Sequence, residues 1–323
     1  MPSCLLIGAG IAGLTAARQL TAHNWDVTVL DKGRGVGGRL ATRRMADGRA
    51  DHGAQVIRAE SAEFRAWLAS PEVQAVVRAW PVDPAGTGWI GYDGMNRVAK
   101  ELSDGLTVET EQTVMSVQAE SAGWRVETQG GRSFRADALL CTIPAPQALA
   151  LFADVSNLLS PADQDALRMV QYDPCLTVLI TLNRPTDIPV PGGLWLDRPD
   201  IAWVADNQQK GISPDQPTAT VLASSAFSRA HLDGDLNEAG QQLLAQLTDY
   251  IPTDTITSTQ VHRWRYSQVV RAYSEPFRRA ETALPLLFGG DGFGGTAPFD
   301  PHLNVERAYL SGRRMADWLL SQR

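Results

Sequence analysis

A glycine motif near the N-terminus limits the possible folds of this chain more than any other feature. The motif follows the apolar run Cys4–Ile7, opens a helix predicted over Ile11–Leu20, and precedes a second apolar run, Asp26–Leu30. A strand, a glycine turn, a helix and a second strand within about thirty residues predict a βαβ unit that binds a dinucleotide. The motif has the pattern GxGxxG and consists of Gly8, Ala9, Gly10, Ile11, Ala12 and Gly13.

Each part of this unit has a physical role in holding a dinucleotide. Gly8 permits a tight turn, Gly10 lets a diphosphate approach the backbone, and Gly13 lets the helix pack closely on the strand. The start of the helix adds free N–H groups and the positive end of the helix dipole. Asp31, directly after the second strand, would accept hydrogen bonds from a ribose, and Lys32 belongs to the same turn.

Length, charge and cysteine content narrow the class of protein. A chain of 323 residues predicts two domains, and a net charge of −7 argues against a nucleic-acid partner. Three widely spaced cysteines exclude a disulfide scaffold and fit a reducing cytoplasm. No apolar stretch reaches the roughly 18 residues of a membrane span, so we expect no membrane partner. The histidines show no metal-ligand spacing, and the oligomeric state is not predicted.

Two further segments resemble FAD proteins of the amine-oxidase type. Gly37-Gly38-Arg39 resembles their GGR segment, and Asp51–Gln55 resembles their D-x-G-A segment. The resemblance implies that Gly38 brings backbone against the cofactor and that Arg39 lies beside its diphosphate. It also implies that a second group of residues runs beside the isoalloxazine ring, namely Gly53, Ala54 and Gln55.

The C-terminal region resembles the other half of such an FAD site. Gly290 and Asp291 lie in the sequence GGDGFGG, which resembles a G-D motif whose aspartate binds ribityl and diphosphate oxygens. A helix predicted after it would begin at Asn304 and Val305 and point toward the flavin, where its dipole stabilises negative charge. Val114 matches a position that holds adenine through backbone atoms, although a core-strand role is equally compatible with its sequence.

These segments predict an α/β fold with two discontinuous domains. A Rossmann-like FAD-binding domain would combine residues 1–56, 94–145 and 284–323, because its motifs lie at opposite ends of the chain. An α+β substrate domain, a β-sheet with helices, would combine residues 57–93 and 146–283. We expect non-covalent FAD, because no cysteine or histidine lies in a recognisable attachment motif.

Two absences restrict the chemistry. The chain has no second GxGxxG between a strand and a helix, which disfavours a separate NAD(P)H domain. Ordinary amine oxidases of this type usually carry a lysine in the substrate domain near the flavin. Only Lys32, Lys100 and Lys210 are available, and Lys210 lies in a polar loop, 207–216, that we expect to be mobile.

The second half of the chain resembles the renalase family. The segment Trp264–Val269, WRYSQV, carries the most specific resemblance, and the GGDGF sequence supports it. Tyr266 stands where animal members have histidine. The resemblance implies an oxidase that converts 2- or 6-dihydro isomers of NAD(P) to NAD(P)⁺ and passes the electrons to O₂ as peroxide. A small-molecule dinucleotide would then be the substrate.

Aromatic side chains are the candidate catalytic residues. Strand alternation places Trp264 and Tyr266 on one face, where they could form a slot for a dihydropyridine ring together with Trp203. The tryptophans could equally be core residues. Two other functions stay open: a general FAD-dependent oxidoreductase of the amine-oxidase or carotenoid type, and a non-catalytic protein that binds FAD or another nucleotide.

Overall fold

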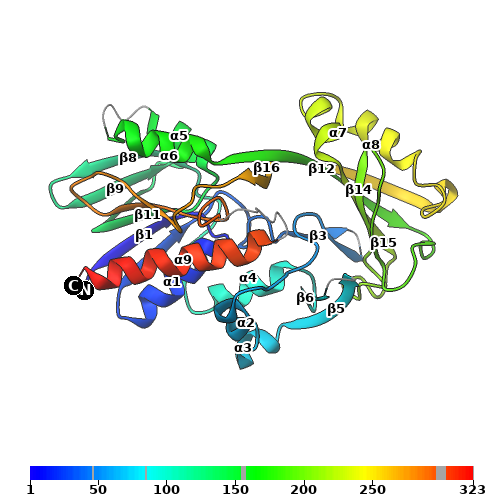
Figure 1. Cartoon of the computed structure of the whole chain (residues 1–323), viewed down its shortest axis with the longest axis horizontal. Helices are drawn as coiled ribbons and strands as arrows, with labels where there is room; N and C mark the ends of the chain where they lie inside the picture. The colour runs from blue at the N-terminus through cyan, green and yellow to red at the C-terminus, as the bar shows by residue number, and fades with distance from the viewer. Residues whose placement is uncertain (46, 84–85, 154–157, 296–302, 323) are drawn as a thin grey trace.

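A mostly parallel sheet organises one half of the molecule. The computed structural model describes the chain except residues 46, 84–85, 154–157, 296–302 and 323. In the described part, the predicted βαβ unit is present, and β1 lies at the centre of a six-stranded sheet (Figure 1). All neighbouring strands are parallel except the edge strand β17, which pairs with β18 antiparallel. The order is β17 (Arg278–Arg279), β18 (Leu286–Phe288), β11 (Ala138–Cys141), β1 (Ser3–Ile7), β2 (Asp26–Leu30) and β7 (Thr107–Glu109).

Both faces of this sheet are covered, because alternate side chains of its apolar strands enter two hydrophobic clusters. Leu6 contributes to one cluster and Leu5 to the other. Helices α1 (Ile11–Ala22), α4 (Asn96–Ser103) and α9 (Asn304–Ser321) contribute to the first. The second includes residues of β8 (Val114–Glu120), β9 (Gly123–Thr128), β10 (Ser133–Ala136), α5 (Ala145–Ala153) and α6 (Pro161–Met169).

Helices α1 and α9 come from opposite ends of the chain and pack at backbone distance. A Cβ added at Gly312 would collide with the carbonyl oxygen of Ala12, so only glycine permits this approach. The contact places the middle of α9 against the first turn of α1 (Figure 1). The two terminal segments therefore form one structural unit, as their motifs predict.

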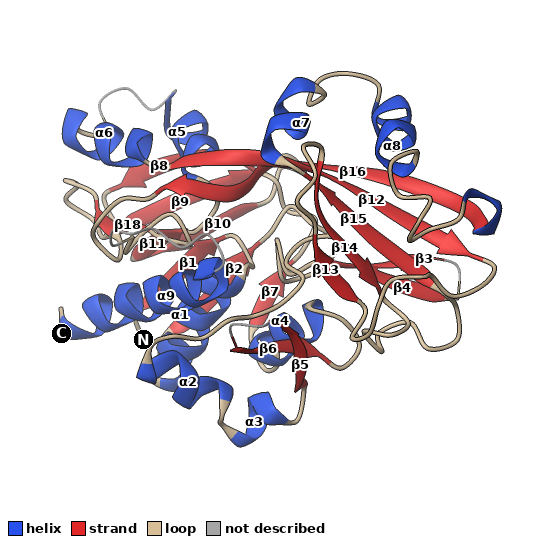
Figure 2. Cartoon of the chain, turned by 45° about the vertical axis from the view of Figure 1, so that its right-hand side comes forward, coloured by secondary structure: helices blue, strands red, loops and turns tan. Residues whose placement is uncertain are grey.

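An antiparallel sheet forms the other half of the molecule (Figure 2). Its alternating apolar residues pack under helix α8, where Val178, Val221 and Leu243 belong to one buried cluster. The sheet order is β13 (Gly193–Trp195), β14 (Ile201–Asp206), β15 (Thr218–Ala223), β12 (Gln171–Leu182) and β16 (Ile256–Arg271). The associated helices are α7 (Ser225–Ala230), α8 (Leu236–Leu244) and the short 3₁₀ helix η1 (Thr253–Thr255).

Two hairpins and two short helices complete the structure. Strand β4 (Gly48–Asp51), which pairs with β3 (Thr42–Met45), packs on the antiparallel sheet, where Thr218 Oγ1 donates to the carbonyl of Arg49 at 2.6 Å. The remaining elements are α2 (Ala62–Leu68), α3 (Pro71–Gln74), β5 (Val77–Asp83) and β6 (Gly86–Gly91). The chain therefore passes between the halves several times.

The predicted fold class is confirmed: a Rossmann-like unit is joined to an antiparallel sheet with helices. The predicted domain boundaries stay a prediction. Buried residues of 57–93, such as Phe64 and Trp80, share a cluster with α1 and α9, and Phe152 shares one with β1. None of the helices in the described ranges is long and apolar enough to cross a lipid bilayer.

Candidate functional site

The glycine turn after β1 is shaped for a diphosphate. Gly8 has a φ of +110°, and its carbonyl accepts a hydrogen bond from Thr142 Oγ1 at 3.0 Å. A Cβ at Gly13 would collide with that carbonyl, so glycine is required there. At Gly10 a Cβ would meet nothing within 4 Å, and helix α1 begins there with no side-chain cap. The start of α1 therefore leaves space and N–H groups for an anion.

A second glycine loop lies on this turn. Asp31, after β2, accepts hydrogen bonds from the N–H of Ala9 and of Gly33, both at 2.7 Å. The N–H of Gly37 donates to the carbonyl of Ala9 at 2.8 Å. Gly38 has a φ of +53°, and its Cβ would lie 3.6 Å from Cα of Gly10. The carboxylate thus joins the two loops, at the place where a ribose was predicted.

Lys32 and Val114 are the other two residues predicted on the adenosine side of the cofactor. Lys32 is exposed. The N–H of Gln112 donates to the carbonyl of Asp31 at 2.8 Å, which brings the chain just before β8 to the ribose-side turn. Val114 opens β8 and is half-buried against the second hydrophobic cluster. Its predicted backbone contact with adenine stays a prediction.

An ion pair joins the N-terminal and C-terminal motifs. Arg39 donates two hydrogen bonds to the carboxylate of Asp291, at 2.6 and 2.7 Å, and their side chains are 28% and 5% exposed. Burial lowers the pKa of Arg39, but the charges of Asp291 and Tyr172 and the hydrogen bonds to them together keep this pKa above its ordinary value. The guanidinium also donates to the carbonyl of Ser267 at 3.1 Å and lies 5.5 Å from the Tyr172 ring centre. Four separate segments meet at Arg39.

The start of α9 lies against the G-D motif. Gly290 has a φ of +133°, which favours glycine there. Arg307 Nε donates to the carbonyl of Asp291 at 3.2 Å, and the same guanidinium hydrogen-bonds the side chain of Asn304. Asn304 and Val305 form the first turn of α9, as predicted. Whether this turn faces a flavin stays a prediction.

The segment after β4 runs beside Arg39. A Cβ at Gly53 would collide with the carbonyl of Arg39, and the N–H of Ala54 donates to that carbonyl at 2.9 Å. Gln55 Nε2 donates to the carbonyls of Asp51 and Gly53, at 2.8 and 3.0 Å. The residues predicted to lie along the isoalloxazine are therefore held directly next to the residue predicted to lie along the diphosphate.

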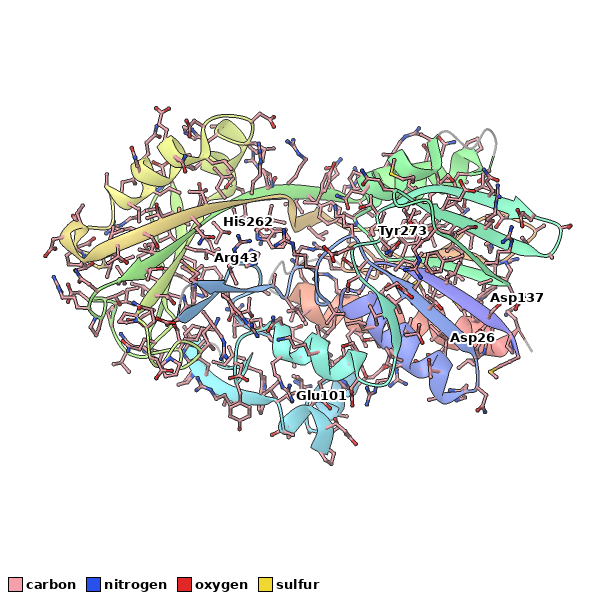
Figure 3. The ribbon with its side chains drawn as sticks, turned by 180° about the vertical axis from the view of Figure 1, so that it is seen from behind. Asp26, Arg43, Glu101, Asp137, His262 and Tyr273 are labelled. Atoms are coloured by element: carbon pink, nitrogen blue, oxygen red, sulfur yellow. The ribbon has the colours of Figure 1, made fainter. Side chains whose placement is uncertain are left out.

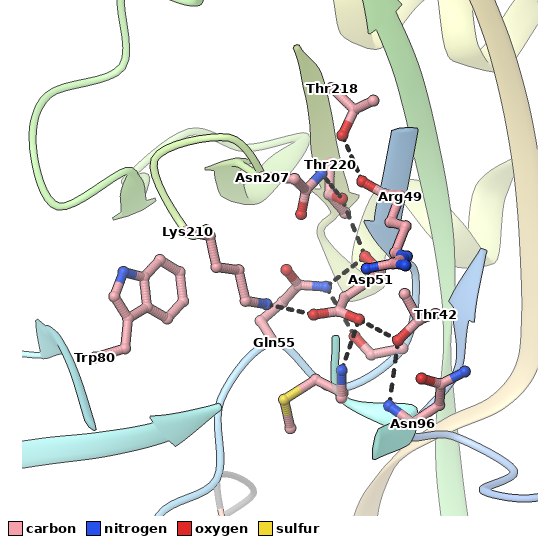
Figure 4. A network of polar contacts seen from close by, with 12 residues as sticks. Thr42, Arg49, Asp51, Gln55, Trp80, Asn96, Asn207, Lys210, Thr218 and Thr220 are labelled. Carbon is pink, nitrogen blue, oxygen red and sulfur yellow. Dashed lines mark hydrogen bonds and ion pairs between the residues drawn. The ribbon is translucent and has the colours of Figure 1, made fainter. Parts of the chain in front are cut away.

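Asp51 is the centre of a buried polar network (Figure 4). Its carboxylate accepts hydrogen bonds from Thr42 Oγ1 and from the N–H of Met95, at 2.5 and 2.9 Å. Its other oxygen lies 2.8 Å from Lys210 Nζ, and neither side chain is exposed. The Asp51 carbonyl accepts from Thr220 Oγ1 at 3.0 Å. This network fixes the segment that leads to Gly53.

The structure corrects the expectation for Lys210. We expected a mobile polar loop, but Lys210 is fully buried, and its Nζ also lies 5.0 Å from the ring centre of Trp80. Burial lowers its pKa from the ordinary value, and the charge of Asp51 opposes that shift. No local pattern marks this residue, because its partner is far away in the chain. Charge pairing in the core explains why this lysine of a polar loop is buried.

Aromatic rings cover the same segment from the side of β16. Trp264 and Tyr266 alternate with exposed arginines on this strand, so they share a face as predicted. Trp264 Nε1 donates to the carbonyl of His52 at 2.6 Å, and the two rings stack with centroids 5.3 Å apart. Tyr266 meets the Tyr172 ring edge-on at 5.9 Å. These contacts extend the aromatic face from His52 to the neighbourhood of Arg39.

Trp203 does not belong to this face. It is fully buried, with its ring 6.0 Å from that of Trp80 and 4.7 Å from that of Trp195. Of its two predicted roles, the structure supports core packing. Trp264 is half-buried beside His52, which keeps it as a candidate residue of the site.

Two histidines at this face are held neutral near pH 7. Burial lowers the pKa of His52 to about 4, and His262 and Arg43 add to the shift, whereas Asp51 opposes it. Burial and Arg43 likewise lower the pKa of His262, which lies 4.6 Å from His52 between ring centres. Figure 3 labels Arg43 on β3 and His262 on β16. Neither ring was expected at this face, because histidines scattered along a sequence resemble surface residues.

Fold and site together define a flavin-dependent oxidoreductase. The chain belongs to the family of flavin-containing amine oxidoreductases, whose model matches residues 76–320. A model for NAD(P)-binding Rossmann-like domains matches residues 6–70.

Known proteins place the chain more closely within this class. Renalase of Mus musculus is a relative with 25% identity over 321 residues, which covers 91% of this chain and 93% of that protein. A solved structure from Exiguobacterium sp. 255-15, named for protoporphyrinogen oxidase, aligns with a TM-score of 0.70 at 14% identity, over 100% of this chain and 99% of that one. An oxidoreductase from Methanosarcina mazei aligns with a TM-score of 0.64 at 14% identity, over 94% and 99%. These two structures support the fold alone.

Removing the cation of the buried pair should destabilise the protein strongly. Lys210→Met leaves the Asp51 carboxylate without its counter-charge, which we expect to lower the free energy of unfolding by about 3–5 kcal/mol. Lys100→Met, at an exposed position of α4, is the control and should change it by less than about 0.5 kcal/mol. Chemical denaturation of both variants measures the difference. If Lys210→Met is as stable as Lys100→Met, the ion pair of Asp51 and Lys210 does not hold the halves together.

Neutral His52 predicts a pH dependence of stability. Its pKa of about 4 lies below the ordinary value of 6.5, so the unfolded chain binds the proton more readily than the folded protein. Stability should fall as the pH decreases from 6.5 to 4, by about 3 kcal/mol from this group. Denaturation curves of His52→Leu should show a shallower loss over that interval, whereas His23→Gln, at an exposed position, should match the wild type. If the free energy of unfolding of His52→Leu falls with pH as steeply as that of the wild type, the lowered pKa of His52 is contradicted.

Proposed function

We propose that the protein is an FAD-dependent oxidase of dihydronicotinamide isomers, 2- or 6-dihydro-NAD(P), which yields NAD(P)⁺ and hydrogen peroxide. The activity is the one that the resemblance to the renalase family implies, and the relative from mouse supports it. One observation carries the proposal. The segment predicted to line the flavin is covered by the aromatic face of β16, while Lys210 is fully buried in an ion pair with Asp51.

The residues of the site fit FAD. The start of α1 at Gly10, with open space and no capping side chain, suits the diphosphate. Asp31 would hold the ribose, and Arg39 and Asp291 would hold the diphosphate and ribityl groups. FAD, when bound, supplies an acceptor for a hydride and returns two electrons to O₂. We propose non-covalent attachment, since Cys4 and Cys141 are buried in strands of the sheet.

The chemistry of the substrate suits a site of this kind. A dihydropyridine becomes aromatic when it loses a hydride, and the ring then has no proton that a base must remove. The protein needs to stack the ring, orient it and exclude water. Trp264 and Tyr266 offer flat apolar surface for that purpose. Lys210 is engaged by Asp51, which supports a reaction that uses no lysine base.

We also propose an electron acceptor and a cellular location for the enzyme. O₂ would be the electron acceptor. All three cysteines are free, and this supports the cytoplasm, a reducing compartment, as the location.

A panel of candidate substrates tests the function directly. Oxidised holoenzyme is mixed without oxygen with 2-dihydro-NAD(P), 6-dihydro-NAD(P), ordinary NADH and simple amines. We expect a dihydro isomer to bleach the flavin absorbance during mixing or within seconds, and NADH and amines to do so slowly or not at all. Air should restore the colour and form peroxide. Rapid bleaching by amines alone would indicate an amine oxidase, and no bleaching at all would indicate a nucleotide-binding protein without this activity.

Substitutions at Tyr266 test whether the aromatic face contacts the substrate. Tyr266→Phe should cost at most one hydrogen bond, about 0.5–1.5 kcal/mol, seen as weaker substrate binding. Tyr266→Ala should slow flavin reduction further, because it opens the face to water. Tyr92→Phe, at an exposed position, is the control. The rates of flavin reduction without oxygen distinguish these roles. If Tyr266→Phe slows reduction by roughly a thousandfold, the hydroxyl takes part in the chemistry. If Tyr266→Ala reduces the flavin at the wild-type rate, Tyr266 does not belong to the site.

A further inference from the structure

The imidazole of His52 has an unused hydrogen-bonding atom. The residue is only 7% exposed, and its Nδ1 has no hydrogen-bond partner among the residues that the structure describes. A buried polar atom without a partner destabilises a folded protein, and a bound ligand or ion is one of the explanations for such an atom. A ligand that reaches this nitrogen would remove the penalty.

Packing holds the ring of His52 in one orientation. The indole of Trp264 stacks on it at an interplanar angle of 20°, and the ring of His262 meets it at 73°. The backbone of His52 is fixed as well, because its carbonyl accepts hydrogen bonds from Trp264 Nε1 and from Thr177 Oγ1, at 2.6 and 3.2 Å. A preordered group of this kind binds a partner with little loss of conformational freedom.

The surroundings of His52 restrict the chemistry of that partner. Aromatic rings on two sides favour a flat, uncharged group, and the imidazole is itself neutral near pH 7. A neutral imidazole carries one donor and one acceptor, so either tautomer pairs with a primary amide. Arg43 lies beside His262 and hydrogen-bonds Gln260 at 3.1 Å, so a cation for a phosphate lies close by. A nicotinamide dinucleotide carries both an amide on a flat ring and a diphosphate.

We propose that His52 is a specificity-determining residue that hydrogen-bonds the carboxamide of the substrate's nicotinamide ring. The inference rests on the proposed function, because it assigns a subsite to that substrate. His52 lies one residue before Gly53, in the segment predicted to run along the isoalloxazine. The carboxamide contact would fix which edge of the ring is presented, while Trp264 supports the imidazole from behind.

Equilibrium binding of the product tests this role without turnover. NAD⁺ and an analogue that lacks the carboxamide are titrated into oxidised holoenzyme and followed by calorimetry. For the wild type we expect NAD⁺ to bind about tenfold more tightly than the analogue, the value of one hydrogen bond in a dry site. His52→Phe keeps a stacking ring but removes both nitrogens. This variant should bind NAD⁺ about as weakly as the analogue, while its affinity for the analogue stays that of the wild type.

Further variants separate recognition from folding. His52→Leu offers a smaller replacement with the same expected loss of selectivity, should the larger ring of Phe prevent folding. His52→Gln retains a hydrogen-bonding amide and should recover part of the preference for NAD⁺, whereas His23→Gln should leave both affinities unchanged. Selectivity that persists in His52→Phe or His52→Leu would overturn the proposal, as would an equal loss of affinity for both ligands, which indicates a structural role.

The outcome for the wild type keeps this inference distinct from the proposed function. A wild-type protein that binds neither nucleotide and oxidises no dihydro isomer would contradict the proposed function itself. A wild-type protein that oxidises a dihydro isomer and prefers NAD⁺, with variants of His52 that keep the preference, would contradict only the role of His52.

Discussion

The buried ion pair between Asp51 and Lys210 holds the two halves of this molecule in register. Neither side chain is exposed, and both charges lie in the interior among other buried polar groups. Isolated burial of either charge would be costly, so each requires the other at hydrogen-bonding distance. Asp51 also accepts hydrogen bonds from Thr42 and Met95, and its carbonyl accepts from Thr220. The pair thereby positions the segment that runs from His52 to Gln55.

A second ion pair builds the site on that base. Arg39 joins the glycine loop to Asp291 near the C-terminus, and its contacts with Ser267 and Tyr172 reach the antiparallel sheet. The carbonyl of Arg39 in turn holds Ala54. The guanidinium therefore links residues with a predicted cofactor role to β12 and to β16, the strand that carries Trp264 and Tyr266. Its planar fork of donors suits such a junction better than a lysine would.

Much of the fold could be predicted because its signals are local. The turn at Gly8 requires a positive φ, the helix behind it needs a close contact at Gly13, and both demands are visible as glycines in a short window. The alternation that places Trp264 and Tyr266 on one face is equally local. Trp203 shows the limit of such reasoning, because a tryptophan on a strand has the same pattern in a core and in a site, and only its neighbours Trp80 and Trp195 distinguish the two.

The sequence by itself determined the βαβ unit, the flavoprotein class and the order of the motifs, because each depends on residue types within a few positions of one another. The tertiary structure alone decided the environment of the charged and polar residues. Lys210 belongs to a loop whose composition is typical of a solvent-exposed segment, yet Asp51 makes its burial possible. His52 becomes a buried, neutral imidazole with an unpartnered Nδ1 in a place where Trp264 and His262 arrive from a distant strand. Desolvation and charge pairing act through space, so the local sequence pattern contains no record of them.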